Sequence, residues 1–465
     1  MESEDDSINV STKSTLEKTE KTEKTEKTEK TYLESDLGLS RLALASDSVT
    51  FTRRKAHYVP AKQSKLKNSL LVGVAFLELG NAGDFAANVW NDIPVPHFVV
   101  ALMAVGGTLA LFLSYFAFKD AKLGWCNLVH LREERRDLQR QKTHDLEDGQ
   151  IIQGLDARLN VSFREIGTES ISRVGLDVCM GVGGIIIGIG TFLAIGGANR
   201  RVWHASNLMS GYIGNVPLAL YALFNGSWSC YVWMKARQHG IAGATALDMD
   251  MAAALLKRRI FTVQMYTAMV GVTGIAAGAA SLISATMWWG YVILIPVIIS
   301  SISCNYIWRK KIAYERPLVQ QRTLGLSKIS LLRELESIIA VQRILKETPS
   351  EPLHKLVSDS QSITSVIEFI IMNDLFEDFC VRLLDDTHLS ELFGIPNEEI
   401  TINSELLLTA DNSYIPHILK IAQTCVSEVG PIHFQYRQRY LLEILGSYLC
   451  VSQAGTSETT TLEKC

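Results

Sequence analysis

Hydrophobic positions in this chain gather in six blocks between residues 69 and 308, and the sequence on either side of them is polar. Each block is long enough to cross a bilayer as a helix. About 20 residues, rising about 1.5 Å each, span a hydrocarbon core of about 30 Å. The pattern therefore predicts a six-helix transmembrane block over residues 68–308, with spans at 69–90, 97–118, 174–198, 208–233, 262–287 and 288–308.

The first block, SLLVGVAFLELGNAGDFAANVW, is apolar yet carries Glu78 and Asp84. Asn81, Asp84 and Asn88 follow the i, i+3, i+4 spacing that places side chains on one helical face. An ionised group inside a membrane costs about 2.5 to 3.5 kcal/mol on insertion scales, so such residues usually face a bundle interior or a cavity. We therefore take Glu78, Asn81, Asp84 and Asn88 as the candidate intramembrane polar site, with Glu78 rotated about 120° from Asp84 around the axis.

Some of the later blocks are rich in small residues, and three blocks end in similar sequences. Gly184 and Gly188 form a GxxxG pair in the third block, which predicts close helix packing. Blocks two, four and six end in LSYFAFKDAK, WSCYVWMKAR and ISCNYIWRKK. A repeated helical hairpin would leave this likeness, and so would the shared need for aromatic and then basic residues at a membrane surface.

Basic residues indicate the orientation of the block. They flank the start of span one, the end of span two, the connection between spans four and five, and the end of span six. The opposite loops carry little positive charge apart from Arg200 and Arg201. Because positively charged short loops stay in the cytosol, both termini are expected on the cytosolic side.

The flanking sequence predicts soluble regions. Residues 1–67 include five Glu-Lys-Thr copies and cannot bury a core, so they are expected to be a disordered cytosolic tail. The charged stretch 128–141 is expected to be a helix with a solvated face. Residues 309–326 are interpreted as a juxtamembrane linker, 327–452 as a soluble helical domain, and 453–465 as a disordered end. Within the domain, helices are predicted at 363–384, 415–429 and 432–450, and the overall fold class is all-α.

The C-terminal domain resembles RGS-like helical domains, which regulate G-protein signalling. The resemblance rests on Phe376 and Phe379 in LFEDFC, on Ala422 and Gln423 in a later helix, and on a closing aromatic helix with Phe434, Tyr436, Tyr440 and Tyr448. The Glu-Asn pair with which that family contacts the G protein does not follow LFEDFC. The resemblance therefore implies an all-helical fold and no functional residue.

Composition and motifs narrow the function. The net charge is −4, and residues 346–412 hold 14 acidic against 3 basic side chains, which argues against nucleic-acid binding by that region. The eight cysteines form no CxxC pair, and neither a metal-binding nor a catalytic motif is found. We therefore expect no enzyme, no catalytic or metal-binding residue and no cofactor.

Two functional interpretations follow from these patterns. In the first, the protein is an anchor or sensor in the lipid bilayer whose acidic helical domain binds a cytosolic protein partner. In the second, it is a small-solute or ion transporter or channel that uses the intramembrane carboxylates and the Asn stripe of the first span.

Overall fold

The computed structural model describes residues 47–54, 57–90, 95–147, 153–196, 199–248, 251–318, 326–386 and 399–462, the side chains of Arg54, Glu147 and 455–462 excepted. The described chain is mostly helical, which confirms the predicted all-α class in part, but it also contains five short strands. It divides into two compact units. The bundle unit comprises Lys65–Lys328 and the chain from Arg439 onward, and the small unit comprises the described residues up to Ser64 together with Ile329–Gln438.

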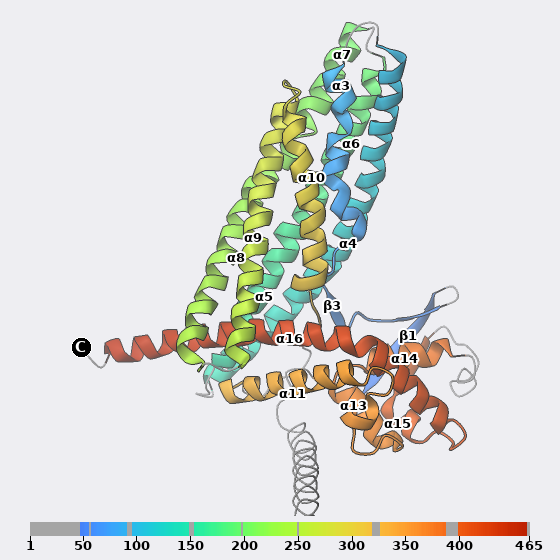
Figure 1. Ribbon diagram of the computed structural model, residues 1–465, viewed down its shortest axis with the longest axis vertical. Helices are drawn as coiled ribbons and strands as arrows, with labels where there is room; N and C mark the ends of the chain where they lie inside the picture. The colour runs from blue at the N-terminus through green and yellow to red at the C-terminus, as the bar shows by residue number, and fades with distance from the viewer. Residues whose placement is uncertain are drawn as a thin grey trace, which may run out of the picture. The chain divides into compact units, whose positions relative to one another are not determined.

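Long helices run side by side in the bundle unit (Figure 1). The α-helices are α4 (His97–Glu147), α5 (Gln153–Gly167), α6 (Leu176–Ala194), α7 (Arg200–Ser206), α8 (Val216–Ala246), α9 (Met251–Ser284) and α10 (Gly290–Ile307). Three π-helical segments continue or join them: η3 (Thr168–Gly175), η4 (Asn207–Ile213) and η5 (Trp308–Ile312).

Within the described residues, four helical stretches are long and apolar enough to cross a membrane. They are His97–Leu146, Gln153–Ala194, Met251–Ser284 and Gly290–Ile312, and they contain or overlap the predicted spans 97–118, 174–198, 262–287 and 288–308. The structure is therefore compatible with an integral membrane protein.

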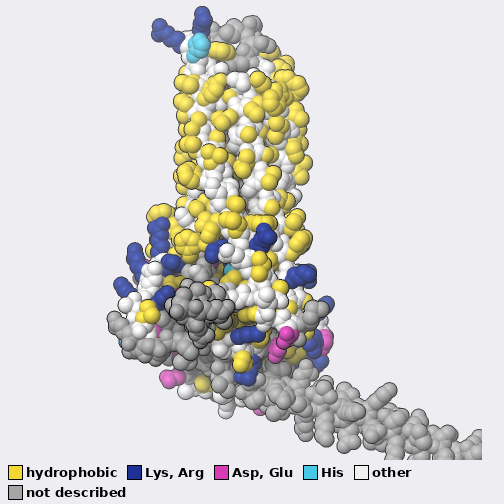
Figure 2. Space-filling model, turned by 90° about the vertical axis from the view of Figure 1, so that its left-hand side faces the viewer, with side chains coloured by type: hydrophobic (Ala, Val, Ile, Leu, Met, Phe, Trp, Pro, Cys, Tyr) yellow, Lys and Arg dark blue, Asp and Glu magenta, His cyan; other side chains and the backbone are white. Residues whose placement is uncertain are grey.

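The surface of these helices is apolar. On the face that Figure 2 shows, hydrophobic side chains cover the bundle, and Lys and Arg gather toward its ends. Phe112, Phe224 and Val272 are among the large apolar side chains that are more than half exposed. A continuous apolar surface of this kind is stable against lipid but not against water.

The predicted first span does not form one regular helix. Residues 72–89 alternate between 3₁₀ and α geometry, and Gly83 lies in one of the 3₁₀ turns. A Cβ on Gly83 would lie 2.6 Å from the carbonyl oxygen of Gly106 in α4, so this close approach requires glycine. The segments are η1 (Val72–Phe76), α2 (Leu77–Asn81), η2 (Ala82–Asp84) and α3 (Phe85–Val89).

The predicted fourth span is also divided, between η4 and the first part of α8, which has a proline in its first turn. Membrane spans at 69–90 and 208–233 therefore stay predictions. The loop expected between spans three and four forms the short helix α7 over most of its length.

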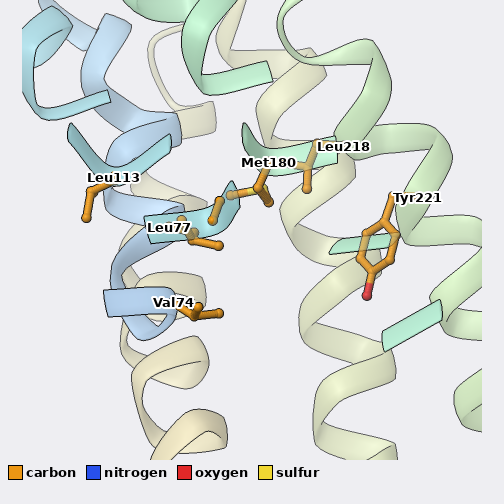
Figure 3. Close-up of a cluster of buried hydrophobic side chains, with 7 residues drawn as sticks. Val74, Leu77, Leu113, Met180, Leu218 and Tyr221 are labelled. Carbon is orange, nitrogen blue, oxygen red and sulfur yellow. The ribbon is translucent and has the colours of Figure 1, made fainter. Parts of the chain in front are cut away.

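A cluster of buried apolar side chains joins the broken first segment to the long helices. Val74 and Leu77 meet Leu113 and Ala117 of α4, Met180 of α6, and Leu218 and Tyr221 of α8 (Figure 3). Gly188 of α6 lies so close to α4 that a Cβ there would be 3.0 Å from the Gly107 oxygen. The small residues thus permit the close contact predicted from GxxxG.

The small unit combines helices with a three-stranded sheet. β1 (Ser48–Arg54) lies between β2 (His57–Pro60) and β5 (Glu399–Asn403), and both pairings are antiparallel, with Phe51 opposite Pro60 and Ile400. The helices are α11 (Lys328–Glu347), α12 (Leu353–Leu356), α13 (Ile363–Met372), α14 (Phe376–Asp385), α15 (Ser404–Leu408) and the first part of α16 (Ile415–Leu462).

Several predictions for the flanking regions are wrong. The described residues between 48 and 67 are not a disordered tail, because they include β1, β2 and β3 (Lys65–Lys67); residues 1–46, 55 and 56 lie outside the described residues. The expected linker 309–326 contains part of η5 and β4 (Glu315–Pro317), which pairs with β3. The strands in both segments are held by backbone pairing with other strands. Strands this short have too few residues for their side-chain pattern to predict them.

The helix boundaries in the C-terminal half also differ. The predicted helix 363–384 is broken between α13 and α14, where Asp374 adopts a left-handed conformation (φ 57°) that Asp tolerates better than most residues. The predicted break at Gly430 and Pro431 is wrong, since α16 continues through Pro431. It also continues to Leu462, into the segment 453–465 that was expected to be disordered.

These elements divide the C-terminal half differently from the predicted domain 327–452. Residues 329–438 cluster with the N-terminal strands, whereas the chain from Arg439 onward clusters with the bundle unit. An autonomous domain with the predicted bounds stays a prediction, and its fragment would lack β1.

Phe51 is expected to hold the sheet of the small unit together. Its side chain is fully buried, so Phe51→Ala should lower the stability of this unit by about 3 to 5 kcal/mol. Hydrogen exchange of full-length protein should then show faster exchange of the amides of β5. Val59→Ala, at a 39% exposed position of β2, is the control. Equal protection of β5 in both variants would contradict the expectation.

Candidate functional site

The predicted polar stripe lies inside the bundle unit, where it contacts two other helices. The Asp84 carboxylate is 1% exposed and accepts hydrogen bonds from the Tyr291 hydroxyl of α10 (2.9 Å) and from Asn88 Nδ2 (2.8 Å). Asn88 Nδ2 also lies 2.8 Å from the Tyr291 hydroxyl. Asn81 Nδ2 donates to Ser281 Oγ of α9 at 2.6 Å. Asp84 and Asn88 thus join one cluster, and Asn81 lies against a different helix.

Glu78, the remaining member of the predicted site, is 7% exposed. It lies beside Asn81 and Tyr221, and its Oε2 has no hydrogen-bond partner. The structure therefore buries Glu78, Asn81 and Asp84 and half-buries Asn88, but it does not gather the four residues into one centre.

A second buried cluster surrounds Arg173 of η3. Arg173 Nε and Nη2 donate to the two oxygens of Asp120 at 2.9 and 3.0 Å, and Nη1 donates to Glu169 at 3.3 Å. Asp120 also accepts the backbone N–H of Leu71 at 3.1 Å. This bidentate pair therefore links α4 and η3 to the chain entering the first predicted span.

A third cluster is built around Arg316 of β4, which is 3% exposed. Its guanidinium donates to both oxygens of Glu134 at 2.8 and 2.7 Å and to both oxygens of Glu165 at 2.9 and 2.6 Å. The Tyr314 hydroxyl also donates to Glu165 at 2.8 Å, and Arg316 lies over the ring of Tyr440 at 5.0 Å. One arginine therefore holds β4, α4, α5 and α16 together.

The fourth cluster contains Glu443 of α16, which pairs with Arg164 and with Arg259 Nε at 2.9 Å. Arg259 also donates to the backbone oxygens of Lys311 and Ile312 at 2.8 and 3.0 Å. Burial alone would raise the pKa of Glu443, but attraction to Arg164 and Arg259 outweighs it and lowers the pKa to about 2. Glu443 is therefore ionised at neutral pH, between two arginines.

A cavity of about 80 Å³ opens beside these clusters. Its walls include Arg164, Arg259 and Glu443 from the fourth cluster, Glu165 from the third and Glu169 from the second. The Nε1 of Trp228, which also lines the cavity, has no hydrogen-bond partner. The rest of the lining is largely apolar, but a cavity of this size with charged side chains in its walls has room for several water molecules.

Sequence reasoning missed three of these four clusters. It treated Glu134 as part of a solvated face, but Glu134 is 5% exposed and paired with Arg316. It counted Arg259 and Arg316 only as juxtamembrane charges, although both are buried. The local signal was present: Leu128, Leu131 and Leu138 give the segment an apolar face, and Glu134 lies close to that face.

Among the described residues, no group of three or more His, Cys, Asp or Glu side chains is arranged to hold a metal ion. No protein-family model, no curated protein and no solved structure matches this chain. The RGS-like resemblance thus rests on the residues quoted for it, and the function must be inferred from the geometry.

Glu443→Gln is expected to destabilise the bundle unit, because it removes the negative charge that balances two buried arginines. The pKa of Glu443 falls from its ordinary value of 4.5 to about 2 on folding, a difference of about 3 kcal/mol. Since the folded pKa is the lower one, this stability is present above about pH 4.5 and is lost as the pH falls toward 2.

Thermal unfolding of purified full-length protein in detergent, measured from neutral to acidic pH, checks this expectation. The gap between wild type and Glu443→Gln should be full at neutral pH and close with acidification. Glu133→Gln, at a 61% exposed side chain, serves as the matched control. A gap that does not change with pH would show that the ion pair is not its source.

Proposed function

We propose that this protein is a multi-pass membrane anchor or sensor whose small unit binds a cytosolic protein partner. The observation that carries the proposal is the course of α16. This one helix supplies Ile415–Gln438 to the small unit and the residues from Arg439 onward to the bundle unit. Each unit holds its own portion of the helix by buried side chains.

The bundle unit holds α16 along one helical face. Arg439, Glu443 and Ser447 are spaced four residues apart and so lie on the same side of the helix. Arg439 donates to the backbone oxygens of Ala313, at 2.6 Å, and Lys310; Ser447 donates to that of Ala157 at 3.0 Å. With the ion pairs of Glu443, these bonds couple α16 to several elements of the bundle.

The small unit holds the preceding turns of the same helix. Cys425, Val426 and Phe434 are fully or almost fully buried. Arg437 pairs with Glu334 of α11 at 2.9 Å, and Gln342 Nε2 donates to the backbone oxygen of Phe434 at 2.9 Å. A rearrangement of the bundle that moved α16 would therefore change the packing of the small unit, which suits a sensor.

The charge of the small unit suits a basic partner. The acidic excess over residues 346–412 includes Asp359 and Glu368, both exposed in the structure. Complementary charge raises the rate of encounter at low salt and discriminates against acidic proteins. The finer topology belongs to the same proposal: six spans, with 69–90 and 208–233 added to the four apolar helices, and both termini in the cytosol.

A second candidate function is transport or conduction of a small solute or ion past the polar stripe. The burial of Asp84 and of Asn81 between helices favours it, because charged groups of transporters face the bundle interior. The hydrogen bonds from Tyr291 and Asn88 to Asp84 favour a structural role instead, so we place this function second.

The proposed topology predicts which residues are accessible from each side. In a chain with its native cysteines replaced, Thr22→Cys should be protected from a membrane-impermeant maleimide in sealed, correctly oriented membranes, and Arg201→Cys should react. Permeabilisation should expose Thr22→Cys. Labelling of both positions from the same side would contradict the three spans, an odd number, that the proposed topology places between them.

The acidic surface of the small unit is expected to select the partner. Proximity labelling from full-length protein in cells should enrich a basic cytosolic protein. The double variant Asp359→Lys with Glu368→Lys should reduce that enrichment several-fold, because it reverses two exposed charges. The matched control, Glu133→Lys with Asp137→Lys, makes the same charge change on α4 and should leave the enrichment unchanged.

Equal enrichment in both double variants would overturn the proposed partner site. Uptake of a solute into liposomes that hold the purified protein, with loss of uptake in Asp84→Asn, would favour the transport function in its place.

A further inference from the structure

The cluster around Arg173 contains more acidic groups than one arginine can balance. Asp120 and Glu169 both accept hydrogen bonds from Arg173, and Asp177, the first acidic residue of α6, lies beside all three. Three carboxyl groups thus share one permanent cation in an interior where Asp120 and Asp177 are 0% exposed. At least one of them must be neutral or acquire another partner, because an unbalanced charge is costly to bury.

Asp177 is the carboxyl group left over. Neither of its oxygens faces a hydrogen-bond donor, because the side chain within hydrogen-bonding reach is another carboxyl group, that of Asp120. The donors of Arg173 are directed elsewhere: Nε to Asp120, Nη2 to Asp120 and the Ser69 oxygen, and Nη1 to Glu169 and the Lys67 oxygen. An ionised Asp177 would therefore be a buried anion without a donor, whereas a protonated Asp177 is a neutral group.

We propose that Asp177 is a proton-binding site of the bundle. In the state described here the proton is held on its carboxyl group. When the proton leaves, the O–H bond of Asp177 breaks, a bond to a water oxygen forms, and the resulting carboxylate competes with Asp120 for Arg173. Proton binding at Asp177 thereby keeps the bidentate pair of Arg173 and Asp120 intact.

The backbone around Arg173 suits an exchange of partners. Arg173 lies in η3, a π-helical segment, and such segments occur frequently at functional sites. The Arg173 and Asp120 pair also bonds the Ser69 oxygen and the Leu71 N–H, which lie at the start of the first predicted span. A change of partner at Arg173 would thus alter how that segment is held.

Water can approach the cluster from the cavity. Glu169 and Ser172 line it, and Glu169 contacts Arg173 directly. Asn127 Nδ2 lies 3.4 Å from the same Glu169 oxygen that Arg173 contacts. Water in the cavity would thus be the proton acceptor, and it would reach the cluster at Glu169.

The charged and titratable groups near Asp177 come from each helix packed around it. They are Asp120 of α4, Glu169 and Arg173 of η3, and Tyr221 of α8, and Tyr221 in turn lies near Glu78 of α2. Arg173 is the one permanent cation in this set of described residues. The site does not depend on the partner proposed for the small unit, and either inference can fail without the other.

Infrared difference spectroscopy of the full-length protein in detergent tests the site. At neutral pH, wild type should show the C=O stretch of a protonated carboxyl group, and labelling with [4-¹³C]aspartate should shift this band. Asp177→Asn should remove it while preserving helical circular dichroism, since Asn has the shape of the neutral acid. Asp84→Asn, the matched control at another buried aspartate, should leave the Asp177 band in place.

Alkaline titration provides the second measurement. Raising the pH should abolish the band and lower the thermal stability of wild type, because a proton that stabilises the folded state is lost. The melting temperature of Asp177→Asn should depend less on pH over the same range. A labelled wild type without a protonated aspartate band, or a band that survives in Asp177→Asn, would overturn the proposal.

Discussion

The cost of burying charge governs the interior of this bundle. An ion taken out of water loses several kcal/mol of solvation, which is recovered only where an opposite charge and enough hydrogen-bond donors meet it. Arg316 with Glu134 and Glu165, and Glu443 with Arg164 and Arg259, satisfy this condition with short, multiple contacts. Removing one partner from either cluster leaves an uncompensated charge, so these clusters fix which elements must stay together.

The same condition explains why segments that look like linkers are ordered. Arg316 stands next to Pro317 in a short polar stretch, and nothing in that stretch alone favours a strand. Its guanidinium pairs with two glutamates on different helices. These ion pairs hold the backbone of residues 315–317 beside β3, with which it pairs as β4. Ordering such a segment costs conformational entropy, and the buried pairs offset that cost.

Structure that depends on neighbouring residues could be predicted from the sequence. The apolar runs in α4, α6, α9 and α10 predicted four helices that the structure shows to be long and apolar enough to cross a membrane. Contacts between residues far apart in the chain could not be predicted. Glu134 and Arg316 are 182 residues apart. Thr50 and Thr401, which pair across β1 and β5, are 351 residues apart. The pattern of residues within one segment does not indicate which distant segment it will contact. The break between α13 and α14 had a local signal, since Asn373 and Asp374 favour turns.

The continuity of α16 is the opposite case, in which tertiary packing overrides a strong local signal. A proline inside a helix removes one backbone hydrogen bond and costs about 3 kcal/mol, which is why Pro431 predicted a break. The helix nevertheless continues, and Val426 and Phe434 on either side of Pro431 are buried. Full burial of a Val or Phe side chain contributes about 1.5 to 3 kcal/mol, which is similar in size to the cost of the proline. The packing around Pro431 therefore overrides the local signal of the proline, and α16 stays one helix from Ile415 to Leu462.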